Sequence, residues 1–88
     1  MSSIANPTIG VTVLYFAALC EQRGLNEESL NLPTAITIAD LYASLAQQHQ
    51  LTLAQNQLRA AVNHKFCAWN QAVVEGDTVA FIPPISGG

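Results

Sequence analysis

The chain has 88 residues, half of them hydrophobic and a tenth charged, with a formal net charge of −3. This length allows one domain with one modest core and leaves little room for an enclosed active site. The three basic residues, Arg23, Arg59 and Lys65, are too few for a basic patch, so we expect no nucleic-acid partner. No apolar run approaches the roughly 20 residues of a membrane span, and residues 1–6 lack a signal-peptide pattern. We therefore expect a cytoplasmic protein with no membrane partner.

The residues that most often carry chemistry are scattered along the chain. Cys20 and Cys67 lie far apart in apolar surroundings, which is typical of reduced thiols that behave as small hydrophobic side chains. His49 and His64 have no neighbours at metal-ligand spacing, and the isolated glycines form no phosphate-binding loop. We therefore expect no metal, no bound cofactor and no catalysis by side chains of this chain.

The first third of the chain predicts a loose leader and two strands joined by a short helix. Residues 1–10 form the leader, and residues 11–16 (Val-Thr-Val-Leu-Tyr-Phe) have the β-branched and aromatic composition of a largely buried strand. A helix over 17–23 follows, because Gly24 stands where helices commonly end. Residues 28–32 alternate polar and apolar side chains, which predicts a second strand paired like a hairpin with the first.

The clearest helix signal begins at Thr37. This residue is a good N-cap, Asp40 follows three positions later, and apolar side chains recur at helical spacing as far as Leu45. The helix is expected to end near residues 48–49. Residues 51–58 then predict a connection that contains one short turn.

The last third predicts strands and turns. Residues 60–67 read as a strand broken by a turn at Asn63-His64, and residues 75–77 (Glu-Gly-Asp) are a turn signal. Residues 78–82 form the last strand, which ends at Pro83-Pro84 because proline cannot donate a hydrogen bond to the sheet.

This element order predicts an α+β fold with a mixed sheet packed against one main helix. The first and last strands are the most apolar, so we place them side by side in the centre of the sheet. The predicted organisation is a leader over 1–10, a domain over 11–82 and a tail over 83–88.

The tail ends in Gly87-Gly88, directly after a predicted strand. Two residues without a Cβ give a thin, sterically open end, which suits a carboxylate that must enter another protein's active site. The six residues beyond Ile82 span about 20 Å when fully extended. We therefore interpret the chain as a carrier that uses its own C-terminal carboxyl group as the reactive group.

Several motifs together resemble the small, sulfur-carrying subunit of molybdopterin synthase. They are Phe16-Ala17-x-Leu19-x-Glu21, Thr37-Ile38-Ala39-Asp40-Leu41, Ala61-Val62-Asn63 and the ending Gly76-Asp77-x-Val79-Ala80-Phe81-x-Pro83-Pro84-x-Ser86-Gly87-Gly88. The resemblance covers about residues 11–88, and the ending is its most specific part. It implies a ubiquitin-like β-grasp fold, in agreement with the element order.

The resemblance also implies a mechanism and a set of partners. An ATP-dependent adenylating enzyme of the ubiquitin-activating type would activate the Gly88 carboxylate, and a sulfur donor protein would convert it to a thiocarboxylate. The tail would then enter the large subunit of molybdopterin synthase, in a heterotetramer, and donate sulfur to a cyclic pyranopterin precursor during molybdenum cofactor biosynthesis. Whether the chain counts as an enzyme stays open, because the catalytic side chains would belong to the large subunit.

Specific residues acquire roles from this resemblance. Gly88 is the reactive group, and Gly87, Ser86, Ile85, Pro84 and Pro83 are expected to thread into the partner. Phe81 and Phe16 are the leading candidates for partner binding, ahead of Phe66 and Trp69. Aromatic side chains in strands of small proteins are more often core than interface. Asp77 is interpreted as a turn residue, and Glu21 as either a surface charge or a partner contact.

Three other functions fit the same ending. The chain could carry sulfur for thiamine, cysteine or transfer-RNA thiolation, or it could be a ubiquitin-like modifier that is conjugated to lysines. The third is a noncovalent binding domain in which the diglycine is incidental. Covalent adducts that depend on Gly88 would identify a modifier, and binding that survives loss of Gly87-Gly88 would identify the third class.

Overall fold

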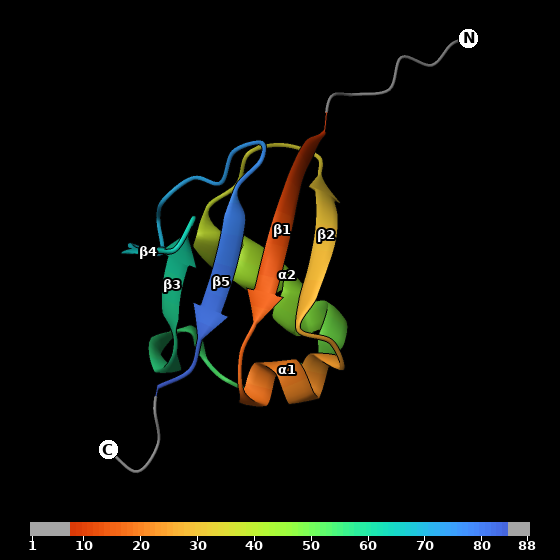
Figure 1. Ribbon diagram of the computed structural model, residues 1–88, viewed down its shortest axis with the longest axis vertical. Coiled ribbons are helices and arrows are strands. Elements are labelled where there is room, and N and C mark those ends of the chain that lie inside the picture. Colours follow the sequence, from red (N-terminus) through yellow and green to blue (C-terminus); the bar gives the residue numbers. More distant parts are fainter. Residues whose placement is uncertain (1–7, 85–88) are drawn as a thin grey trace, which may run out of the picture.

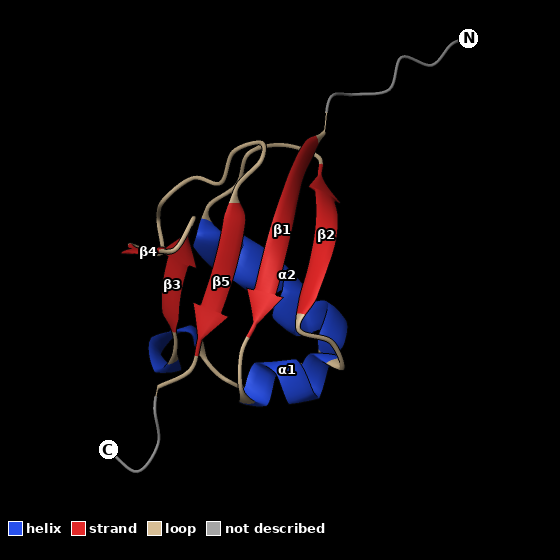
Figure 2. Ribbon diagram, in the orientation of Figure 1, coloured by secondary structure: helices blue, strands red, loops and turns tan. Residues whose placement is uncertain are grey.

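The computed structural model describes residues 8–84, which form one sheet and the helices around it (Figures 1 and 2). In chain order the elements are β1 (Ile9–Tyr15), α1 (Ala18–Arg23), β2 (Glu27–Leu32), α2 (Ile38–His49), the 3₁₀ helix η1 (Gln55–Gln57), β3 (Arg59–Val62), β4 (Lys65–Cys67) and β5 (Thr78–Ile82). The expected order of strands and helices is confirmed, and with it the α+β class. None of the helices in residues 8–84 is long and apolar enough to cross a membrane.

The strands follow the order β2-β1-β5-β3-β4 across the sheet. The first and last strands, β1 and β5, are parallel neighbours at the centre, as predicted. The other pairs, β1–β2, β3–β5 and β3–β4, are antiparallel. Helix α2 crosses one face of this sheet, and α1 lies beyond the end at which β1 and β5 stop (Figure 1). No helix of residues 8–84 covers the opposite face.

The core lies between the sheet and α2. Alternate residues of the central strands, Val11, Val13 and Tyr15 of β1 and Val79 and Phe81 of β5, are buried on the side that faces the helix. Helix α2 contributes its apolar stripe to the same cluster: Ile38, Leu41, Tyr42 and Leu45. Burial of these apolar side chains away from water is the main contribution to the stability of a small domain.

The predicted start of α2 at Thr37, its end near residues 48–49 and the end of α1 at Gly24 are confirmed. The Thr37 Oγ1 accepts a hydrogen bond from the Asp40 backbone N–H at 3.1 Å, which satisfies one of the unpaired donors at the start of α2. Gly24 ends α1 in the left-handed region, with φ of 84°, and its N–H donates to the Cys20 carbonyl.

Strand β1 begins at Ile9, two residues earlier than predicted. The backbone N–H of Gly10 donates to Glu75 Oε1 at 2.8 Å, and the Gly10 carbonyl accepts from the N–H of Gly76 at 2.8 Å. Ile9 and Gly10 also pair with Leu32 and Asn31 of β2, so pairing with β2 and the contact with the distant turn together extend the strand.

Candidate functional site

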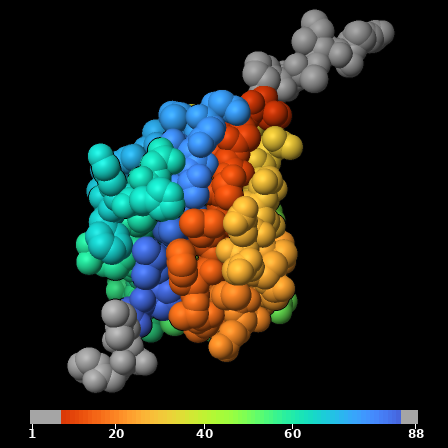
Figure 3. Space-filling view, in the orientation of Figure 1, coloured from red at the N-terminus to blue at the C-terminus, as the bar shows by residue number. Residues whose placement is uncertain are grey.

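The uncovered face of the sheet carries an apolar groove of about 210 Å³. Its lining comes from the two central strands and from the β3–β4 hairpin: Leu14, Phe16, Ala61, His64, Phe66, Thr78, Ala80 and Ile82. Figure 3 views this face, with β5 and β1 between the β3–β4 segment on one side and β2 on the other. The groove therefore spans the centre of the sheet, on the side away from α2.

Strand register explains why this face is hollowed. Leu14 of β1 pairs with Ala80 of β5, Ala80 pairs with Ala61 of β3, and Ala61 pairs with Phe66 of β4. This row runs across four strands and has its two smallest side chains in the middle. Two adjacent alanines leave a depression, and the larger Leu14 and Phe66 form its sides.

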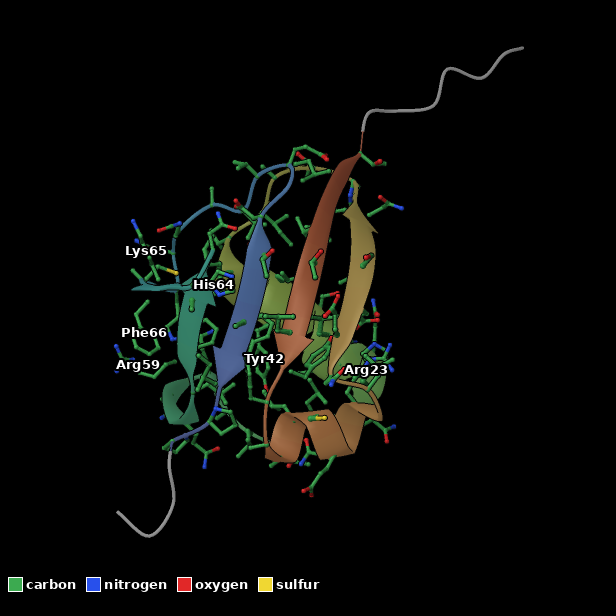
Figure 4. The ribbon with its side chains drawn as sticks, viewed as in Figure 1. Arg23, Tyr42, Arg59, His64, Lys65 and Phe66 are labelled. Carbon is green, nitrogen blue, oxygen red and sulfur yellow. The ribbon has the colours of Figure 1, made fainter. Side chains whose placement is uncertain are left out.

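Two exposed aromatic side chains form walls of the groove. Phe16 is 44% exposed and Phe66 is 59% exposed, although both are large and apolar. Exposed apolar side chains that gather around one hollow are typical of a protein-binding surface. The Arg59 guanidinium lies over the Phe66 ring, 4.0 Å from its centroid (Figure 4).

The β3–β4 turn places His64 at the rim of the groove. Asn63 and His64 both have positive φ, 53° and 72°, as a tight two-residue hairpin turn requires. The Asn63 side chain donates to Asp77 Oδ1 at 3.0 Å and accepts from the Thr78 backbone N–H at 2.9 Å. These bonds fix the hairpin against the start of β5.

Asp77 is therefore a structural residue, in agreement with its interpretation as part of a turn. It is 8% exposed, and its second oxygen, Oδ2, accepts from the Val74 backbone N–H at 2.9 Å. Glu21, for which two roles were open, lies exposed on α1.

A charged cluster stabilises the junction of β1, α1 and β2. The Arg23 guanidinium donates two hydrogen bonds to Glu28, at 2.7 and 3.1 Å, and the Tyr15 hydroxyl donates to the same carboxylate. Burial of Glu28 acts to raise the pKa of its carboxyl, but the hydrogen bonds from Arg23 and Tyr15 outweigh burial and lower it. Burial, together with the hydrogen bond to Glu28, raises the pKa of Tyr15, so the phenol stays neutral.

Cys20 and Cys67 are both free and partly buried, and burial raises the pKa of the Cys67 thiol. Within residues 8–84, no three His, Cys, Asp or Glu side chains lie close enough together to hold a metal ion.

The groove adjoins the point at which the chain enters the predicted tail. Ile82 ends β5 and lines the groove, and Pro83 and Pro84 follow it. The other tail residues to which roles were given, Ile85, Ser86, Gly87 and Gly88, lie outside the described residues. Their part in threading and reaction therefore stays a prediction.

The two leading candidates for partner binding have different positions. Phe16 lines the groove and is exposed, so its position would allow contact with a partner. Its role in partner binding stays a prediction. Phe81 was predicted wrongly as a surface contact, because it is fully buried. Its ring lies 5.0 Å from that of Tyr42 and 6.0 Å from that of Trp69. In an alternating strand Phe81 must face α2, since its neighbours Ala80 and Ile82 face the groove.

The other two aromatic candidates also differ. Trp69 is partly buried, with its ring stacked on Phe81 at an interplanar angle of 9°, so it belongs with the core. Phe66 is the more exposed, and it forms a wall of the groove.

Sequence reasoning missed most of the groove, including Leu14, Ala61, His64 and Ala80. The alternation of β1 and β5 could have identified Leu14 and Ala80, once the two strands were placed side by side. Ala61 and Phe66 depend on the register of β3 against β5 and β4, for which the sequence gives no signal.

The element order, the mixed sheet and its single covering helix define a ubiquitin-like β-grasp domain. A putative subunit 1 of molybdopterin converting factor from Pyrococcus furiosus superposes with a TM-score of 0.73 at 26% identity, over 88% of this chain and 99% of that one. SAMP1 of Haloferax volcanii superposes with a TM-score of 0.74 at 23% identity, over 90% of this chain and 99% of SAMP1. A similar chain is also found in the complex of subunits 1 and 2 of molybdopterin-converting factor from Helicobacter pylori. It superposes with a TM-score of 0.63 at 21% identity, over 91% of this chain and 100% of that chain. The last two likenesses concern the fold alone.

Sequence comparison identifies the family. The model of the ThiS family matches residues 13–88, and the chain belongs to this family. The human molybdopterin synthase sulfur carrier subunit is 34% identical over 86 residues, which cover 93% of this chain and 98% of the human protein. The Escherichia coli protein of the same name is 32% identical over 80 residues, which cover 89% of this chain and 99% of the relative.

Proposed function

We propose that this chain is the sulfur carrier subunit of a molybdopterin synthase. The observation that carries the proposal is its similarity to curated sulfur carrier subunits from a bacterium and from human, which it matches over nearly their whole length. The family match continues through residue 88, so it includes the diglycine. The apolar groove beside the last strand supplies a surface on which a large subunit would dock.

The reacting group is the Gly88 carboxylate. A carboxylate resists attack because it is an anion with a poor leaving group, and transfer of AMP from ATP turns it into a mixed anhydride with release of pyrophosphate. The terminal sulfur of a donor persulfide then displaces AMP and forms an acyl disulfide. A thiol cleaves this disulfide and leaves the thiocarboxylate on Gly88, and the donor is released as a disulfide.

The thiocarboxylate is then delivered to the large subunit. The groove holds the β-grasp domain against that subunit, and the segment after Ile82 carries the sulfur to the pterin precursor bound there. The β5 strand couples the two tasks, because Ile82 lines the groove and the tail begins at the next residue. The acids, bases and pterin pocket belong to the large subunit.

A reconstituted synthase tests this function. Purified chain, adenylating enzyme, sulfur donor, large subunit, ATP and cyclic pyranopterin precursor are combined, and formation of the dithiolene product is measured. The wild-type chain should support product formation, and a chain without Gly87-Gly88 should not. A Gly88→Ala variant should fold normally but fail to load sulfur, because a methyl group next to the carboxylate obstructs the adenylation site. Product formation by the truncated chain would overturn the proposal.

A further inference from the structure

The uncovered face of the sheet, on which the large subunit would dock and which we call the docking face, has a second hollow beside the groove. It has a volume of about 420 Å³ and is lined by Leu14, Tyr15, Phe16, Ala17, Cys20, Asn26 and Glu27. Leu14 and Phe16 line both hollows, so they form a ridge between them. A partner that covers this face must therefore fit over a ridge, with a recess on either side.

The side of the groove at β3 carries a positive charge. Arg59 pairs with Ile82 and lies two residues before Ala61, so it is on the same face as the groove. It is exposed, and the Phe66 ring beneath it limits the positions of its guanidinium. Within residues 8–84 the only ion pair joins Arg23 to Glu28, so no carboxylate of the described chain neutralises Arg59.

The opposite side of the same face carries a negative charge. Glu27 pairs with Leu14 on the edge strand β2, is exposed and lines the second hollow. It belongs to no ion pair among the described residues. The strand order separates Arg59 from Glu27 by β5 and β1, so the two charges flank the apolar centre of the face. Figure 4 shows Arg59 at the β3–β4 side, and Figure 1 shows β2 at the other.

We propose that Arg59 and Glu27 set the orientation in which the large subunit docks. The partner surface then carries apolar side chains for the two recesses, a carboxylate opposite Arg59 and a basic side chain opposite Glu27. Rotation of the partner by half a turn about the centre of the face would bring like charges together, which complementary interfaces avoid. This inference rests on the proposed function, and it adds the charge pattern that the partner must carry.

The orientation matters because the reactive segment leaves from one end of the central strand. The chain continues from Ile82 of β5 toward the diglycine, so a reversed partner would place its catalytic pocket at the wrong end of the sheet. An apolar groove with two alanines at its floor allows the partner to bind, but it does little to select one orientation of the partner. The two opposite charges at the sides of the face select that orientation.

Binding of the purified large subunit to charge variants tests the proposal. Dissociation constants are measured by isothermal titration calorimetry at low and at high salt for wild-type, Arg59→Glu, Glu27→Lys and the doubly reversed chain. Each single reversal should weaken binding about tenfold at low salt, and the loss should shrink at high salt.

Matched controls carry the same charge changes outside the docking face. Lys65 pairs with Val62, whose side chain is in the core, so Lys65 leaves the β4 strand on the face opposite to Phe66. Lys65→Glu and, on α2 at the other face of the sheet, Asp40→Lys should change the dissociation constant by less than about twofold. Circular dichroism confirms that each variant is folded.

The outcomes separate this inference from the proposed function. If Arg59→Glu and Lys65→Glu weaken binding equally, only net charge matters and the orientation proposal is wrong, while the carrier function stands. Unchanged binding of both Arg59→Glu and Glu27→Lys also overturns the orientation proposal alone. If the wild-type chain does not bind the large subunit at all, both proposals fail.

Discussion

At the scale of single residues, Asp77 is the polar side chain on which the shape of the groove rim depends. One oxygen accepts from the Asn63 side chain and the other from the Val74 backbone, and the residue is buried. Its removal deletes two hydrogen bonds to a charged acceptor, and such bonds contribute more than an average hydrogen bond. We expect Asp77→Ala to lower the free energy of unfolding by about 2 kcal/mol, measured by urea denaturation.

Glu21 provides the control for this change, because it is an acidic residue on the exposed surface of α1. Glu21→Ala should alter the free energy of unfolding by less than about 0.5 kcal/mol. Equal effects of the two substitutions would show that the Asn63–Asp77 contact contributes nothing to stability.

The Arg23–Glu28–Tyr15 cluster predicts a dependence of stability on pH. The pKa of Glu28 is lower in the folded chain than in the unfolded chain, where it is about 4.3. The stability that Glu28 contributes is therefore complete above that unfolded value and is lost as the pH falls through the folded value. Glu28→Gln should cost about 1–2 kcal/mol at pH 7, because it replaces a charged acceptor with a neutral one.

Urea denaturation at a series of pH values checks this prediction. The difference in stability between the wild-type chain and Glu28→Gln should be constant at neutral pH and should shrink below about pH 4. A difference that stays constant from pH 7 to pH 3 would contradict the account of the cluster.

At the scale of elements, β5 performs two tasks with its two faces. Val79 and Phe81 are fully buried against the core, and Ala80 and Ile82 line the groove. The strand composition is apolar on both sides, so the sequence does not indicate which face meets a partner. Phe81 was assigned to the interface because the resemblance places it near the tail, although its position in the alternation places it in the core.

The elements themselves were predictable where their ends carry a local signal. Thr37 with Asp40 marks the start of α2, and Gly24 marks the end of α1, since each cap forms within a few residues of the chain. The start of β1 was missed because it depends on how far the pairing with β2 continues, to Ile9 opposite Leu32, and on the contact of Gly10 with the distant Glu75. The groove was missed for the same reason, since its floor exists only when β3 pairs with β5 in one register.

The alanine floor of the groove gives a prediction for the β5 strand. Ala80→Leu adds bulk on the groove side, where there is open space, so the free energy of unfolding should change by less than about 1 kcal/mol. The same bulk fills the recess that the partner needs. Binding of the large subunit should therefore weaken by more than about tenfold, measured by isothermal titration calorimetry.

Ala43→Leu is the matched control, because Ala43 is exposed on α2, which covers the other face of the sheet. It should leave the affinity of the large subunit unchanged within about twofold. Full affinity of Ala80→Leu would show that the partner does not enter the groove.

At the scale of the whole molecule, the fold separates stability from function. The core and its single helix occupy one face of the sheet, and the exposed aromatic side chains Phe16 and Phe66 lie around the groove on the other. This division explains why the carrier class could be predicted from the ending of the sequence, while the proposed docking surface required the structure. The ending is a contiguous motif, whereas the docking surface is assembled from four strands.

The central claim is that Gly88 carries sulfur, and the mass of the intact chain tests it most directly. The chain is isolated from its own cells, its mass is measured, and the C-terminal peptide is fragmented. The account predicts a population in which one oxygen of the Gly88 carboxyl group is replaced by sulfur. An unmodified carboxylate, both in the isolated chain and after incubation with ATP, a sulfur donor and the cognate adenylating enzyme, would contradict it.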